Sequence, residues 1–145
     1  GMMMGGRRAS RVCAMQALFY MDMNQNTSSE MFERYCNSFD SPQEILPFAK
    51  KLVKGVIAAK PEIDAIIGRF SSNWKMSRMS GVDRNIMRIA VYELLFCDDI
   101  PPKVTINEAI DVGKKFSTKE SGAFINGILD NVRISLGKED ICSKT

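Results

Sequence analysis

The sequence predicts an all-α protein of about seven helices, arranged as two small packed bundles within one compact domain. Hydrophobic residues make up 45% of the 145 residues and charged residues 26%, which is the composition of a globular protein with a core of its own. Apolar residues recur at helical spacing in several long windows, and no run alternates with period two for long enough to indicate a strand. Capping residues and prolines stand before several of these windows.

The helices can be placed in order from these signals. The buried face expected of the first helix consists of Ala9, Cys13, Gln16, Ala17 and Tyr20. A shorter helix through residues 31–39 follows a polar break. Ser41-Pro42 then predicts a new helix start, because proline suits the first helical position. Lys60-Pro61 is expected to separate that helix from another, which runs to Phe70.

The second half of the chain carries clearer boundaries. The helix from Val82 is apolar nearly all round, so it belongs in the middle of a bundle, and Pro101-Pro102 ends it. Two segments, 105–108 and 117–120, have the spacing of capping boxes, in which a hydroxyl and a glutamate each satisfy a free backbone N–H. Gly137 is a typical residue for the end of the last helix.

Composition argues against an enzyme. The chain has no histidine, the commonest metal ligand and general base, and its four cysteines form no Cys-x-x-Cys pair. Gly122–Gly127 has the glycine spacing of a P-loop but lacks the Lys-Ser/Thr that follows it, and the acid pair Asp98-Asp99 has no apolar surroundings. No apolar run approaches a membrane span, and no signal peptide is visible. We therefore expect a reduced, cytoplasmic protein without metal or cofactor.

Basic residues near the amino terminus indicate a binding surface. Arg7, Arg8 and Arg11 precede the first acid, although the formal net charge is only +3. At 100° per residue, Arg8 and Arg11 share one stripe with Met15 and Phe19. That stripe is either a basic, partly aromatic ridge for RNA or a protein partner, or a second packed face of the helix, and the sequence leaves both open.

A second candidate is the helix start near residue 117. Free N–H groups and the positive end of the helix dipole suit phosphate, and Lys119 adds charge. Phe124, one turn later, would stack on a base if it were exposed. The alternative is an ordinary capped helix with Phe124 in the core.

Together, these residues carry a resemblance to a known family. Arg7–Arg11, Ala14–Phe19, Val82–Leu94, Pro101–Ile110 and Ser121–Leu129 stand in the order and at the spacing of the bacterial transcription antitermination factor family NusB. The resemblance implies an all-helical fold without enzyme activity. It also implies binding to boxA RNA together with the small-subunit ribosomal protein that acts as NusE, within an RNA polymerase antitermination complex on ribosomal RNA operons.

The resemblance also implies roles for individual residues. The RNA-binding set expected from it, completed by Phe19 and Lys119 from the reasoning above, is Arg7, Arg8, Arg11, Phe19, Arg88, Lys119, Glu120 and Phe124. Asp83 matches the acid that meets the ribosomal protein. Met15, on the stripe of the first helix described above, is also expected to contact the protein partner. Ala123 stands where the family often has lysine, and Gly113 where alanine is usual.

The expected domain spans residues 7–137. Residues 1–6 are expected to be a disordered tail that begins with an expression scar, Gly1, and residues 138–145 a flexible tail. Alternatives remain: a NusB-like module that binds only protein, or an RNA-guiding domain like that fused to ribosomal RNA methyltransferases. Because no glycine-rich cofactor-binding segment follows, we expect a free-standing factor. A homodimer formed through the Phe19 ridge, in the absence of the partner, is also left open.

Overall fold

The computed structural model describes residues 2–38, 43–71 and 78–138, with side chains from residue 6 onward, and these residues form six helices and no strand. The helices are α1 (Met2–Met23), α2 (Ser29–Ser38), α3 (Leu46–Phe70), α4 (Gly81–Phe96), α5 (Pro102–Phe116) and α6 (Lys119–Ser135). The all-α prediction is confirmed.

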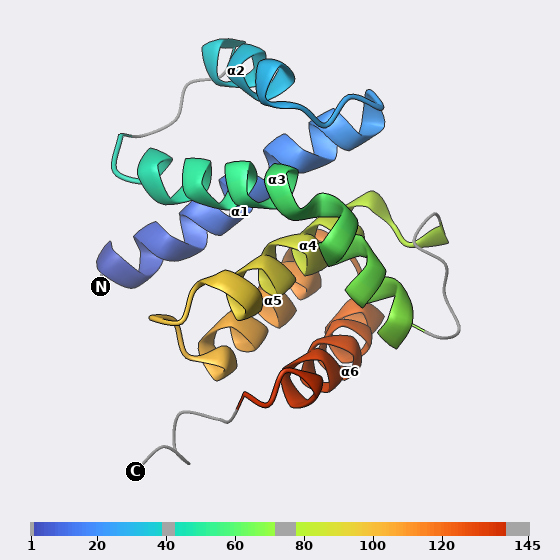
Figure 1. Cartoon of the computed structure of the whole chain (residues 1–145). Helices are drawn as coiled ribbons and strands as arrows, with labels where there is room; N and C mark the ends of the chain where they lie inside the picture. Colours follow the sequence, from blue (N-terminus) through green and yellow to red (C-terminus); the bar gives the residue numbers. More distant parts are fainter. Residues whose placement is uncertain (1, 39–42, 72–77, 139–145) are drawn as a thin grey trace.

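Helix α4 lies in the middle of the molecule, with α1 to α3 on one side and α5 and α6 on the other (Figure 1). Nearly every residue of α4 from Asp83 to Leu94 is buried, as its apolar sequence predicts. One continuous apolar cluster reaches from Leu18 and Leu52 in the first group of helices to Leu129 in the last. The two expected bundles therefore share a single core.

The break expected at Lys60-Pro61 is a kink within α3 and not a gap between two helices. Ala59 has non-helical backbone angles, φ −111° and ψ 17°, and Pro61 has no N–H to bond the carbonyl one turn earlier. Because of this kink, the described residues form six helices where seven were expected. Helix α3 begins at Leu46, with Pro47 in its first turn, whereas the start expected at Ser41-Pro42 lies outside the described residues.

Two of the expected helix starts are wrong in detail. Helix α5 begins at Pro102, so the segment 105–108 lies inside the helix and forms no capping box. The cap of α6 is Thr118, whose hydroxyl accepts from the Ser121 N–H while the Ser121 hydroxyl accepts from the Thr118 N–H. Glu120 therefore belongs to the first turn but takes no part in the capping box. A Ser/Thr-x-x-Ser cap closes the same hydrogen bonds with a different residue.

The ends of the chain differ from expectation in one respect. Helix α1 begins at Met2, so residues 2–6 are helical where a disordered tail was expected. At the other end, Gly137 follows α6 with φ +71°, a conformation that favours glycine, and it stops the helix as predicted. Of the expected flexible tail 138–145, all but Lys138 lies outside the described residues. No helix in the described ranges is long and apolar enough to cross a membrane.

Candidate RNA-binding surface

Arg11 is not a surface residue. Its side chain is buried between α1 and α4, where Nε and Nη2 donate to the two carboxylate oxygens of Glu93, both at 2.9 Å. The Thr105 hydroxyl donates to the same carboxylate at 2.8 Å. This ion pair engages Nε and Nη2 of the guanidinium inside the protein, so Arg11 presents no free pair of donors to an RNA phosphate in this structure. Its expected RNA contact stays a prediction.

Arg8 is exposed but already paired. Its guanidinium donates to both oxygens of Glu108, at 3.0 and 2.7 Å, and to Asp111 at 2.8 Å. The hydrogen bond from Arg8 holds the pKa of Glu108 below its usual range, although burial acts in the opposite direction. A phosphate could reach Arg8, but it would compete with two carboxylates.

Arg7 is the arginine of this group that remains available. It is exposed, and its guanidinium lies over the Phe48 ring, 4.1 Å from the ring centre. A cation–π contact orients the guanidinium plane but occupies none of its N–H donors. Among the expected arginines, Arg7 therefore has the geometry best suited to phosphate.

Arg88 is a second arginine that the structure moves from the expected surface into the interior. It is 5% exposed, donates to both oxygens of Asp64 at 2.8 and 3.0 Å, and lies 3.3 Å from Asp22. Burial alone would raise the pKa of Asp22, but the hydrogen bond from Arg84 and the charge of Arg88 lower it. Arg88 thus joins α4 to α1 and α3, and its expected RNA contact is not available here.

The stripe on α1 is mainly a packed face, the second of the two alternatives. Met15 is buried beside Arg11 and Val112, so it cannot contact a protein partner as expected. Phe19 is half-buried, and its ring covers Gly81 at the start of α4, so closely that a Cβ on Gly81 would lie 2.7 Å from it. The partly covered ring leaves only part of the expected apolar ridge exposed.

The start of α6 keeps the features that suit an anion. Lys119 and Glu120 are both exposed in the first turn, next to the cap formed by Thr118. Phe124 is partly buried and packs against the core with one side. Both interpretations of Phe124 therefore apply in part: it contributes to packing and still presents some surface.

Asp83 joins this helix start to α4. One carboxylate oxygen accepts from the Ser121 hydroxyl at 2.9 Å, while the other has no hydrogen-bond partner in the structure and is shielded from solvent. The residue is only 8% exposed. Asp83 is therefore not exposed to a partner protein in this structure. Its carboxylate instead links the starts of α4 and α6 through the hydrogen bond from Ser121.

The sequence interpretation missed the acids that engage the arginines. Glu93, Glu108 and Asp111 contact residues roughly 80 to 100 positions away, which no local pattern reveals. A partial signal was present: Glu108 and Asp111 share one face of α5, as residues three apart on a helix do. No cluster of three or more metal-ligating side chains occurs within the described part of the chain.

The fold and the surface first define the class of protein: an all-α protein whose polar features are ion pairs between helices, exposed cations and a capped helix start.

Comparison with known proteins then identifies the family. The NusB family model matches residues 8–133. The transcription antitermination protein NusB of Desulfatibacillum aliphaticivorans is 52% identical over 97% of this chain and 99% of its own. That of Desulforapulum autotrophicum is 50% identical over 90% and 93%. The chain belongs to the NusB family.

Solved structures agree with this assignment. NusB of T. maritima superposes with a TM-score of 0.75 at 36% identity, covering 87% of this chain and 89% of that one. A chain from a crystal structure of the antitermination factors NusB and NusE in complex with double-stranded RNA gives a TM-score of 0.78 at 27% identity, covering 91% and 98%.

Proposed function

We propose that this protein is a transcription antitermination factor that binds boxA RNA together with a small-subunit ribosomal protein of the NusE type, and so promotes processive transcription of ribosomal RNA operons. The observation that carries the proposal is the likeness, over 91% of this chain, to a structure whose NusB chain is held with NusE and RNA. This role requires binding but no catalytic step, and it places the protein in the cytoplasm, where transcription takes place.

The RNA contacts we propose are fewer than the resemblance implied. Arg7, Lys119 and Phe124 present cationic or aromatic surface, and Arg8 is available by exchange of its carboxylate partners for phosphate. Glu120, exposed beside Lys119, repels phosphate and thereby limits affinity. We assign Arg11 and Arg88 to the support of α1 and α4, because both are buried in ion pairs.

For the protein partner, we propose an indirect role for Asp83. Its hydrogen bond to Ser121 sets the relative position of the starts of α4 and α6, and exposed residues around those starts would meet the ribosomal protein. Asp83→Leu keeps the approximate shape of the side chain and removes the oxygen that accepts the hydrogen bond from Ser121. We expect this variant to weaken the partner complex through a shifted α6 start, visible as changed backbone amide resonances at residues 117–121.

A filter-binding assay tests the proposed function. We expect a boxA oligonucleotide to be retained weakly by this protein alone and much more strongly when the ribosomal partner is present, whereas a scrambled oligonucleotide of equal length is not. The fact that Arg8, Arg11 and Arg88 all engage acids within the chain favours one alternative, a module that binds only protein. Normal partner binding without any gain in boxA retention would establish that alternative and refute the proposal.

A further inference from the structure

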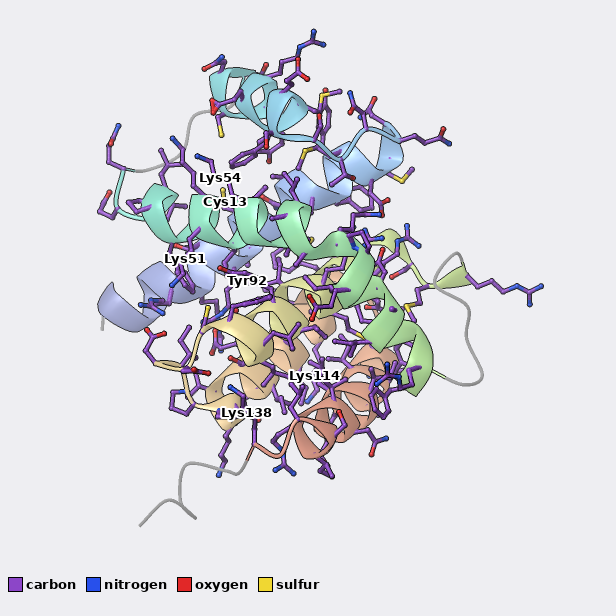
Figure 2. All side chains as sticks on the ribbon, in the orientation of Figure 1. Cys13, Lys51, Lys54, Tyr92, Lys114 and Lys138 are labelled. Atoms are coloured by element: carbon purple, nitrogen blue, oxygen red, sulfur yellow. The ribbon has the colours of Figure 1, made fainter. Side chains whose placement is uncertain are left out.

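A cationic and aromatic surface lies at the other end of α4 from the α6 start. It consists of Arg7 on α1, Lys51 and Lys54 on α3, and Tyr92 and Phe96 on α4, and we call it the α3–α4 surface. In Figure 2, Lys51 and Tyr92 are labelled below α3, and Lys54 is labelled above it. Asp83 stands at one end of the 16-residue helix α4 and Phe96 at the other, so roughly 20 Å separates the two regions.

The aromatic part of this surface depends on a close approach of two helices. The Tyr92 ring lies directly against the backbone of Gly55, in space that any side chain at position 55 would occupy. The Phe96 ring follows one turn later, 5.4 Å from the Tyr92 ring centre, and Phe96 is 51% exposed. Because Tyr92 fixes one side of Phe96, the open side is a flat apolar shelf.

Cations flank this shelf. Lys51 precedes Gly55 by one turn of α3 and is exposed. Lys54 is also exposed but lies further round α3, toward Cys36 on α2. Arg7 lines one hollow with Asp99 and Ile100, just beyond the end of α4. Burial raises the pKa of the Cys97 thiol, next to Phe96, while the charges of Lys51 and Arg7 act against that rise. No carboxylate of the described residues lies within 4.0 Å of Arg7, Lys51 or Lys54.

The acids of this region leave the surface a net positive charge. Glu93 is buried and paired with Arg11, and Asp98 is paired with Lys138 at 2.7 Å. Asp99 is the exposed acid near Cys97, against the two cations Lys51 and Arg7.

We propose that the α3–α4 surface is a second RNA-binding surface, which takes single-stranded nucleotides that flank the segment held at the α6 start. Stacking on Phe96 suits any base, since every base has a π face, and the lysines suit the phosphates between stacked bases. Arg7 and Phe19 lie 12 residues apart on α1, about 18 Å, and Phe19 packs at the start of α4. Arg7 therefore connects the two regions. Only nucleotides outside a short recognition element would reach Lys51 and Phe96. The inference rests on the proposed RNA-binding function.

The test compares two RNAs with the full chain and its ribosomal partner. One is boxA alone, and the other is boxA extended at each end by about eight unstructured nucleotides, a length within the range of single-strand sites. We expect the wild-type complex to bind the extended RNA at least about fivefold more tightly, the lower limit for one stacked base. In Phe96→Leu and in Lys51→Ala/Lys54→Ala this gain should disappear, while affinity for boxA alone stays unchanged.

Matched variants separate this surface from general effects. Phe96→Tyr should keep the gain, because tyrosine stacks as phenylalanine does. Arg34→Ala/Arg69→Ala removes two exposed cations elsewhere and should also keep it. The double lysine variant should lower the salt slope for the extended RNA by about 1.4, or about 0.7 for each lost phosphate contact.

Each contrary result has a distinct meaning. Equal affinity of the wild type for the two RNAs, with boxA still bound, overturns the second surface and leaves the proposed function intact. A gain that survives in Phe96→Leu and the lysine variant, or that falls equally in Arg34→Ala/Arg69→Ala, also overturns it. Failure of the wild-type complex to bind boxA at all refutes the proposed function itself, and this inference with it.

Discussion

Arg7, Arg8 and Arg11 are close in the sequence, yet the structure gives them three different environments. Arg7 lies on an aromatic ring, Arg8 is held by two partly exposed acids, and Arg11 is enclosed with Glu93. Burial decides which role each can have, because a buried charge must keep its partner whereas an exposed one can exchange it. The local sequence reveals neither the burial of these arginines nor their partners, because the partners belong to helices far along the chain.

We predict that Arg11→Ala destabilises the protein by roughly 3–5 kcal/mol, because it leaves the Glu93 carboxylate buried and unpaired. Urea unfolding followed by circular dichroism would measure this. Arg7→Ala, on the same helix but exposed, is the matched control and should change the free energy of unfolding by no more than about 0.5 kcal/mol. Equal stabilities of the two variants would contradict the buried role of Arg11.

The pair of Arg8 with Glu108 predicts a pH dependence. Because the pKa of Glu108 is lowered in the folded state, the pair's stabilisation is fully present above the ordinary value of 4.5 and is lost as the pH falls through the folded-state value. Arg8→Ala should therefore be less stable than the wild type at pH 7, by about 1 kcal/mol or less since Arg8 is half exposed. The gap should close in strong acid; a gap that stays constant down to pH 2 would be inconsistent with this pair as its source.

At the scale of the element, the helix starts show what a local pattern can predict. The spacing of Thr105 and Glu108 is that of a capping box, but the same spacing inside a helix simply places both side chains on one face. In α5 these two residues reach Glu93 and Arg8 instead. Pro102 starts α5, whereas the sequence pattern predicts only that the proline pair ends the preceding helix. A proline pair permits both interpretations, and the fold decides between them.

Glu120→Gln is predicted to bind boxA RNA more tightly with little change in stability. The carboxylate lies in the first turn of α6 but makes no capping hydrogen bond, so its removal should cost only the dipole interaction, about 0.3–1 kcal/mol. The matched control is Glu30→Gln, an exposed acid in the first turn of α2. If both variants have the RNA affinity of the wild type, the α6 start does not face the RNA.

Phe124→Ala tests the same element from its apolar side. Because Phe124 is only partly buried, we expect a loss of roughly 1–3 kcal/mol in RNA binding per folded molecule, the range for one stacked base. A smaller loss of folding stability than the 3–5 kcal/mol typical of a fully buried phenylalanine should accompany it. A destabilised variant with native affinity would make Phe124 a packing residue alone.

Gly113 explains one departure from the family pattern through packing between α5 and α6. A Cβ at this position would lie 2.6 Å from Cδ1 of Ile125, which is fully buried. Gly113→Ala should therefore destabilise the protein, since overpacking typically costs about 1–3 kcal/mol and exceeds the roughly 1 kcal/mol gained in helix propensity. Adding Ile125→Val removes the clashing methyl and should recover part of the loss in a double-mutant cycle of thermal unfolding. A Gly113→Ala protein more stable than the wild type would refute this explanation.

At the scale of the whole molecule, the helices are not equally well packed against the core. Helix α4 contacts both groups of helices, whereas α2 contacts α1 and α3 and buries a single side chain, Phe32. Apolar periodicity predicted both helices correctly. It did not predict this difference, because the depth of a helix depends on how many neighbours cover it. The ion pairs of Arg11 and Arg88 fall on the better-covered helix and join it to α1 and α3.

We predict that α2 opens locally well before the protein unfolds. Amide hydrogen exchange followed by mass spectrometry should show residues 29–38 exchanging much faster than those of α4, because few apolar contacts have to be broken to release them. Phe32→Ala should speed exchange in α2 while exchange in α4 stays nearly constant. Equal protection of the two helices would show that α2 belongs to the same cooperative unit as the core.

The contact between Gly55 and Tyr92 has a consequence for variation among relatives. Since a Cβ at position 55 would overlap the Tyr92 ring, a chain that gains a side chain there must displace the ring or replace it with a smaller residue. Positions 55 and 92 should therefore change as a pair over the course of descent, with glycine opposite an aromatic residue, or a larger residue opposite a smaller one. A larger residue at position 55 would also push α3 away from α4 and remove the support of the Tyr92 ring from residue 96. We therefore expect relatives without this glycine to lack the exposed aromatic surface at position 96.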